Sequence, residues 1–132
     1  MAETTLTAEI AVFLDRLSAL MQARDPAIIE LFTDDDTTLL VGSEPGEIAR
    51  GRMAITMLFA AIFASPNAVH WQWDIIEAAR HGDIAWFFAE GSAVLVGLEE
   101  TVWRAYRLSG VLVQHGGNWR LAQFHGSEPM IG

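Results

Sequence analysis

The chain of 132 residues contains no cysteine, which excludes disulfides, thiolate metal sites and cysteine nucleophiles. It also contains no lysine, so its eight basic residues are all arginines; they stand against 17 acidic residues, for a formal net charge of −9. Because nucleic-acid binding depends on neutralising phosphates, this balance argues against nucleic-acid partners, and it argues equally against anionic membrane surfaces. The absence of cysteine is consistent with the cytoplasm, which is the compartment we expect.

Long apolar runs are missing as well. Apolar runs such as residues 84–89 fall far short of the about 18 residues that a membrane-spanning helix needs. The first residues show neither the basic nor the apolar region of a secretory signal, so none is expected. We therefore expect no membrane partner.

The motifs that hold phosphates, dinucleotides or metals are also missing. The chain has no phosphate-binding glycine loop, nucleophile elbow or dinucleotide fingerprint. Residues 34–36 are three consecutive aspartates, but they lack the glycine and the distal glutamate of a calcium loop and are interpreted as a solvated turn. The histidines are scattered without ligand spacing, so we expect neither a metal nor an organic cofactor.

Apolar material, in contrast, is abundant: 52% of the residues are hydrophobic and 19% are charged. This composition excludes disorder and fits one compact domain, which we expect to span residues 1–132. A monomer of this size does not readily bury so much apolar surface. We therefore expect the surplus to form an exposed apolar face, a pocket, or both.

Hydrophobic periodicity and turn signals predict helices first and strands afterwards. Helices are expected over residues 6–24, with Thr7 as N-cap, over 26–32, with Asp25 as N-cap, and over 52–63. Strands are expected over 37–41 and then, as an antiparallel meander, near 68–79, 84–96, 101–115 and 119–126. This order predicts an α+β fold in which a curved sheet wraps around the helices.

Alternation along the strands sorts their side chains into two faces, provided that the turns have the expected lengths. Two-residue turns at 81–82 and 116–117 and a four-residue turn at 97–100 place Glu90 opposite Arg107 on a broad aromatic face; a turn off by one residue would exchange the faces. We expect this face to be convex and to form a homodimer. The interface residues expected on it are Trp71, Trp73, Trp86, Trp103, Arg107 and Phe124.

The opposite face has small residues at its centre, and we expect it to be concave and to form a pocket for a small, apolar molecule. His125 would transfer a proton there, because its ordinary pKa lies near 6.5, or would only hydrogen-bond to the backbone at the strand end. Asp74 would be a second titrating group, or would reach solvent or pair with an arginine. The residues expected to hold the substrate are Tyr106, Gln123, Gln72 and Glu44; Tyr106 and Gln123 would orient a carbonyl or hydroxyl group, or would only hydrogen-bond to each other.

The loop over residues 42–47 is expected to rim the mouth of this pocket. Glu44 on this loop is the candidate substrate contact. Glu47 is interpreted as a structural ion pair with Arg50 or Arg52. The tryptophans are interpreted as core and interface residues rather than as a ligand cage.

Four stretches of the chain resemble the SnoaL-like branch of the nuclear transport factor 2-like, or ketosteroid isomerase-like, superfamily. They are Leu31-Phe32-Thr33-Asp34-Asp35, Gly42-Ser43-Glu44-Pro45-Gly46-Glu47 running into Gly51-Arg52, Gly117-Asn118-Trp119-Arg120, and Gln123-Phe124-His125-Gly126-Ser127-Glu128. The resemblance covers essentially the whole chain. It implies a cone-shaped, curved antiparallel (mixed) sheet wrapped around three N-terminal helices, a cystatin-like or ketosteroid isomerase-like α+β barrel. It also implies dimers through the sheet and a pocket between the sheet and the helices.

This superfamily contains isomerases, dehydratases, epoxide hydrolases, polyketide cyclases and non-catalytic assembly domains, so the resemblance implies no single activity. Its isomerases combine an Asp or Glu base with a tyrosine and a protonated acid. That full set cannot be placed here, and Tyr106, the only tyrosine, lies on a late strand, which argues against steroid isomerase chemistry. We expect either cofactor-free isomerase, dehydratase or cyclase chemistry on a small hydrophobic ligand, or a non-catalytic dimerisation or ligand-sensing domain.

Overall fold

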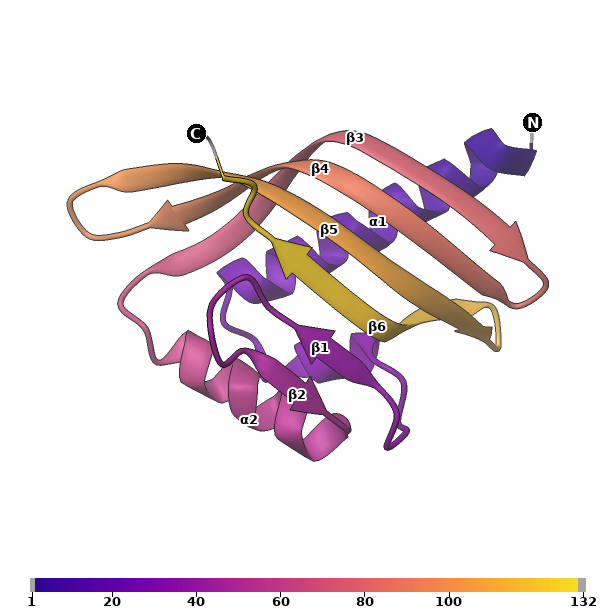
Figure 1. Ribbon diagram of the computed structural model, residues 1–132, viewed down its shortest axis with the longest axis horizontal. Coiled ribbons are helices and arrows are strands. Elements are labelled where there is room, and N and C mark those ends of the chain that lie inside the picture. The colour runs from indigo at the N-terminus through magenta and orange to yellow at the C-terminus, as the bar shows by residue number, and fades with distance from the viewer. Residues whose placement is uncertain (1, 131–132) are drawn as a thin grey trace.

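The computed structural model describes residues 2–130, in which helices pack against one face of a curved, six-stranded sheet (Figure 1). The ends of the expected domain, residues 1 and 131–132, lie outside the described residues. No helix in the described part of the chain is long and apolar enough to cross a membrane. In chain order the elements are α1 (Ala2–Gln22), the 3-10 helix η1 (Pro26–Leu31), β1 (Leu39–Val41), β2 (Ile48–Arg50), α2 (Arg52–Phe63), β3 (Ala68–His81), β4 (Ile84–Val96), β5 (Thr101–His115) and β6 (Asn118–Ser127).

The sheet has the strand order β2-β1-β6-β5-β4-β3, and all neighbours are antiparallel except β1 and β6, which are parallel. The predicted α+β fold with a curved mixed sheet is therefore confirmed. The expectation of a barrel is wrong, because β2 and β3 are the two edges of an open sheet (Figure 1). The edge at β3 is covered by α1: the hydroxyl of Ser18 accepts a hydrogen bond from the N–H of Trp71 at 2.8 Å and donates to its carbonyl at 3.2 Å.

The helices follow the predicted spacing with small differences at their ends. The apolar stripe of α1 is buried, but the helix begins at Ala2, so Thr7 lies inside it and is not its cap. Asp25 caps η1 as predicted, since its carboxylate accepts a hydrogen bond from the N–H of Ala27 at 2.9 Å. The short strand β2 was not predicted, because three residues with only Ala49 buried give no readable alternation.

A β-bulge in β3 reverses the expected facing of the first half of that strand. Pairing runs from His81 opposite Ile84 to Ile75 opposite Glu90, and then shifts so that Trp73 lies opposite Gly91. Asp74 is thus an extra residue without a partner on β4. Since one inserted residue turns every later side chain to the other face, Trp71 and Trp73 point towards the helices and not outwards as predicted.

A second bulge has the same effect at the end of β6. The predicted pairing of the last hairpin holds from His115 opposite Asn118 as far as Leu112 opposite Leu121, and there it shifts. Phe124 is consequently buried on the inner face, and His125 points outwards. The sequence-based sorting of faces is correct between the two bulges and wrong beyond each of them.

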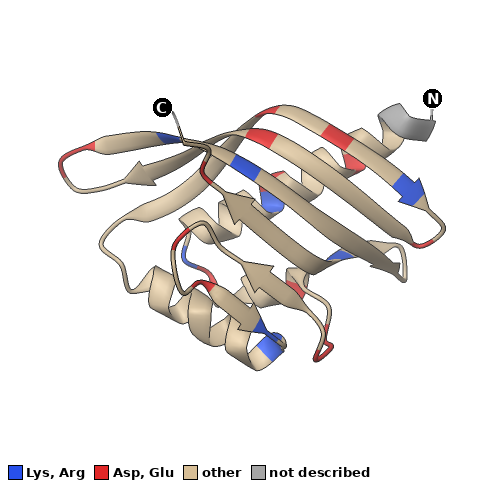
Figure 2. Cartoon of the chain, in the orientation of Figure 1, with Lys and Arg blue, Asp and Glu red and all other residues tan. Residues whose placement is uncertain are grey.

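The outer face of the sheet keeps an aromatic character with a central ion pair. Trp86 is 49% exposed and Trp103 is 57% exposed. The guanidinium Nε of Arg107 donates to the carboxylate of Glu90 at 2.9 Å, as the pairing of their strands predicted. Acidic and basic bands accordingly lie side by side on β4 and β5 in Figure 2. Trp71, Trp73 and Phe124, which were expected on this face, instead pack on the inner face and do not belong to it.

Candidate functional site

A cavity of about 370 Å³ opens between α2, the loop over residues 42–47 and the inner face of the sheet. Its wall is mostly apolar, with polar side chains gathered on and near that loop and at the end of β6. The apolar lining comprises Met21, Leu40, Leu58, Phe59, Ala61, Ile62, Val69, Trp71, Ala93, Leu95 and Phe124. The other lining residues are Gly42, Ser43, Glu44, Glu47, Ser65, Arg104, Tyr106 and Glu128.

Tyr106 on β5 is a buried phenol in the wall of this cavity. It is 5% exposed, and its ring lies 6.0 Å from that of Trp71. Its hydroxyl lies against the backbone of Gly126 on β6, and any side chain at position 126 would clash with it. Burial raises the pKa of Tyr106 well above the ordinary value of 10, the nearby charges of Glu47 and Glu128 raise it further, and a hydrogen bond with Ser43 opposes them. The hydroxyl therefore stays neutral and can donate a hydrogen bond to a ligand oxygen.

The loop between β1 and β2 brings a carboxylate to the same cavity. The carboxylate of Glu47 accepts a hydrogen bond from the N–H of Glu44 at 3.0 Å, and the carbonyl of Glu47 accepts one from the N–H of Gly42 at 2.7 Å. Gly42 has to be a glycine, since a Cβ there would come within 2.8 Å of the Cβ of Glu47. The loop thus fixes Glu47 at the cavity.

The expected ion pair of Glu47 with Arg50 or Arg52 is not formed. The guanidinium of Arg52 instead lies 3.8 Å from the carboxylate of Asp34 and donates a hydrogen bond to the carbonyl of Ile29 at 3.3 Å. Glu47 is the site residue that the sequence interpretation assigned to the wrong role. The two glycines of its loop, Gly42 and Gly46, were the available signal for a tight turn that holds a side chain in a fixed place.

The six predicted site residues fall into two groups. Tyr106 and Glu44 line the cavity, as expected. The other four are exposed and do not line it: His125 and Gln123 lie beyond the bulge in β6, and Asp74 and Gln72 lie at the bulge in β3 and before it. The prediction that they face the pocket is wrong, because the bulges were invisible in the sequence. In the part of the chain that the structure describes, no group of three or more His, Asp and Glu side chains could hold a metal ion.

The burial of Tyr106 predicts an unusual dependence of stability on alkaline pH. The chain has no lysine or cysteine and one tyrosine, so no other side chain titrates near pH 10. Since the folded state keeps the proton that the unfolded chain loses at about pH 10, the free energy of unfolding is expected to fall above that pH, by up to about 1.4 kcal/mol per pH unit. Urea unfolding at several pH values, with tyrosinate absorbance as a second readout, measures this slope. The Tyr106→Phe variant should lose the slope; a wild type that shows none would place the phenol in solvent.

The sequence model of the SnoaL-like domain family matches residues 10–132, nearly the whole chain. The chain belongs to the SnoaL-like domain family. No curated protein sequence matches it.

Several solved structures share the fold of this SnoaL-like chain. A proposed scytalone dehydratase from Novosphingobium aromaticivorans has a TM-score of 0.82 and 17% identity, over 98% of this chain and 89% of the other. ActVI-ORFA from Streptomyces coelicolor has a TM-score of 0.79 and 19% identity, over 94% and 97%. A proposed calcium/calmodulin-dependent protein kinase II association domain from Xanthomonas campestris has a TM-score of 0.77 and 17% identity, over 92% and 86%. At these identities the likeness is one of fold.

Proposed function

We propose that the cavity binds a small, largely apolar molecule that carries a carbonyl or hydroxyl group, and that the SnoaL-like chain acts on it by acid/base chemistry. The observation that carries this proposal is that a neutral phenol, Tyr106, and a carboxylate, Glu47, line the same apolar cavity. The mostly apolar lining supports this proposal, because small-molecule sites typically combine an apolar wall with a few polar groups that orient the ligand. The similarity to a proposed dehydratase agrees with this class of chemistry. We keep the cytoplasmic location predicted from the composition as part of the proposal.

The two polar groups have complementary roles in this proposal. Glu47, as a carboxylate, can take a proton from carbon or from a hydroxyl group of the ligand. Tyr106 can donate a hydrogen bond to the ligand oxygen on which negative charge develops, and a buried donor stabilises that charge more than water does. Together they would support an isomerisation, a dehydration or a cyclisation, since each of these begins with such a proton transfer.

The Glu47→Gln variant tests the proton transfer. We expect the wild type to accelerate exchange of the α-protons of 2-tetralone in D₂O, followed by proton NMR, and the variant to lose about 100-fold or more of this acceleration. Tyr106→Phe should also be slower. Glu30→Gln, which removes an exposed carboxylate on η1, should behave as the wild type. If Glu47→Gln exchanged as fast as the wild type, Glu47 would not be the base.

A second candidate function, a homodimerisation domain, is favoured by the exposed tryptophans of the outer face. Trp86 and Trp103 flank the Glu90–Arg107 ion pair on neighbouring strands, and a twofold axis through this surface would bury both rings. The likeness to a proposed association domain agrees with it. This function is compatible with a ligand in the cavity, because the cavity lies on the other side of the sheet.

The Trp103→Glu variant tests the dimer. We expect the wild type to sediment as a dimer and the variant as a monomer, because the substitution places a charge in an apolar interface. Leu98→Glu, at the exposed tip of the β4–β5 turn, is the matched control and should remain dimeric. A dimeric Trp103→Glu protein would show that the outer face is not the interface.

A further inference from the structure

The mouth of the cavity carries more negative than positive charge. Of the residues that the structure describes, three carboxylates line it, those of Glu44, Glu47 and Glu128, and one guanidinium, that of Arg104. Arg104 is shared between two of them, at 3.6 Å from Glu44 and 3.7 Å from Glu128. Among the described residues no cation lies within ion-pair distance of Glu47. One guanidinium cannot balance three carboxylates, so a bound ligand meets a net negative field at the mouth.

The wall behind this mouth is aromatic. The ring of Trp71 lies 6.0 Å from those of Tyr106 and Phe124, and all three residues line the cavity. The faces of such rings attract cations through their quadrupoles, and aromatic surroundings are typical of sites for quaternary ammonium groups. Among the described residues, Arg104 is the one basic side chain that lines the cavity, and it already pairs with two glutamates. It is therefore not free to bind a ligand carboxylate or phosphate.

We propose that the ligand of this cavity is a cationic amphiphile, in which an amine or quaternary ammonium group is attached to the apolar body that also carries the carbonyl or hydroxyl group. This inference rests on the proposed ligand-binding function and adds the charge class of the ligand. The apolar body fills the aliphatic part of the cavity, and the cation lies against the aromatic rings near Glu47, whose charge has no partner of opposite sign among the described residues. An anionic ligand of the same shape is excluded by the repulsion of the carboxylates and by its own desolvation. The net charge of −9 adds a long-range attraction for cations.

Three probes with the same phenylbutyl body and different head groups test the charge class: a trimethylammonium ion, an alcohol and a carboxylate. By isothermal titration calorimetry we expect the ammonium probe to bind at least about tenfold more tightly than the alcohol, and the carboxylate to bind more weakly than either. The difference in affinity between the ammonium probe and the alcohol should shrink as salt is added, because salt screens charges that lie near the surface.

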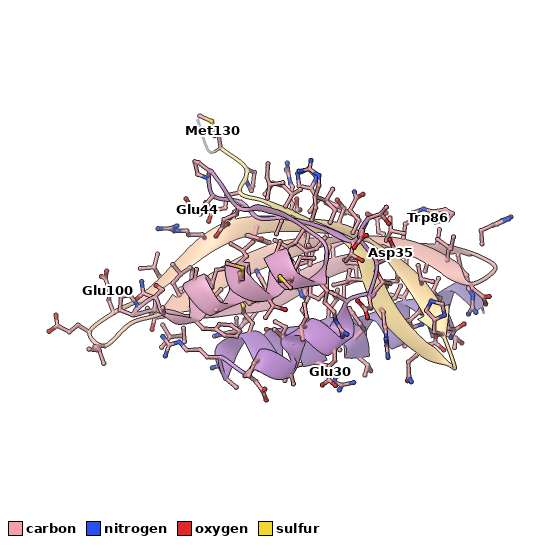
Figure 3. All side chains as sticks on the ribbon, turned by 90° about the horizontal axis from the view of Figure 1, so that it is seen from below. Glu30, Asp35, Glu44, Trp86, Glu100 and Met130 are labelled. Atoms are coloured by element: carbon pink, nitrogen blue, oxygen red, sulfur yellow. The ribbon has the colours of Figure 1, made fainter. Side chains whose placement is uncertain are left out.

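Variants that remove one negative charge show which carboxylates cause the tighter binding of the ammonium probe. Glu47→Gln and Glu128→Gln should each reduce the advantage of the ammonium probe over the alcohol by about threefold or more. Glu30→Gln is the control, since this exposed carboxylate lies on the opposite side of the molecule from Glu44 and the loop (Figure 3). It should leave the advantage unchanged.

The outcomes separate this inference from the function on which it rests. If the alcohol binds as tightly as the ammonium probe, or the carboxylate binds best, the charge class is wrong while the cavity remains a ligand site. If none of the three probes binds, the proposed binding function itself fails for molecules of this size. An ammonium preference that survives both glutamate variants would place the cation elsewhere and overturn the inference.

Discussion

The Ala61→Trp variant is expected to bind 2-tetralone at least about 100-fold more weakly than the wild type while folding normally. Ala61 lies on α2, is exposed and lines the cavity, so an indole at this position can occupy the opening without entering the core. Small molecules gain their affinity from the apolar surface they bury in such a cavity, and a filled opening removes most of that surface. Calorimetric titration of the two proteins, with circular dichroism to confirm the fold, measures the effect.

Ala19→Trp is the matched control for this prediction. It introduces the same indole on a helix, at an exposed residue of α1 that does not line the cavity, and should leave affinity unchanged. Equal binding by Ala61→Trp and the wild type would move the ligand to another surface, for which the outer face of the sheet is the first candidate.

The Trp71→Ala variant is expected to lose about 3–5 kcal/mol of unfolding free energy. Trp71 is 7% exposed and packs against Trp73, Tyr106 and Phe124, so its removal leaves a large void between α1 and the sheet. Urea unfolding followed by circular dichroism gives the difference from the wild type. Since Trp71 also lines the cavity, the variant should bind aromatic ligands less tightly.

Leu98→Ala is the control for stability, because Leu98 is fully exposed and its truncation should change the unfolding free energy by no more than about 0.5 kcal/mol. This comparison decides between two placements of Trp71. If Trp71→Ala cost no more than Leu98→Ala, the tryptophan would lie on the outer face, as simple alternation predicts, and the bulge in β3 would be absent.

Most of the fold was predictable from the sequence, because it depends on periodicity and turns. The boundaries of α2, β4 and β5 follow directly from the apolar spacing and the glycine-rich turns that flank them. The pairing of Glu90 with Arg107 was predictable for the same reason, since the turn between β4 and β5 has the expected length. The three-residue strand β2 carried too few residues for any pattern.

The candidate site was harder to predict, because each β-bulge changes the face of every residue beyond it. Tyr106 was assigned correctly because β5 stays in the predicted register with β4 throughout. His125 was assigned to the wrong face by the single extra residue in β6, and Trp71 by the one in β3. Glu47 was misassigned for another reason: Arg52, one of its expected partners, lies near Asp34 instead, and the folded loop brings the Glu47 carboxylate near Tyr106.

In the proposed site, Tyr106 and Glu47 face a ligand in the cavity between α2 and the sheet. A crystal structure of the protein with 2-tetralone tests this arrangement. We expect the ligand to lie against Trp71 and Phe124, with its carbonyl oxygen within hydrogen-bond distance of the Tyr106 hydroxyl and its α-carbon facing the Glu47 carboxylate. A ligand bound on the outer face of the sheet, or one in the cavity with its carbonyl turned away from Tyr106, would contradict it.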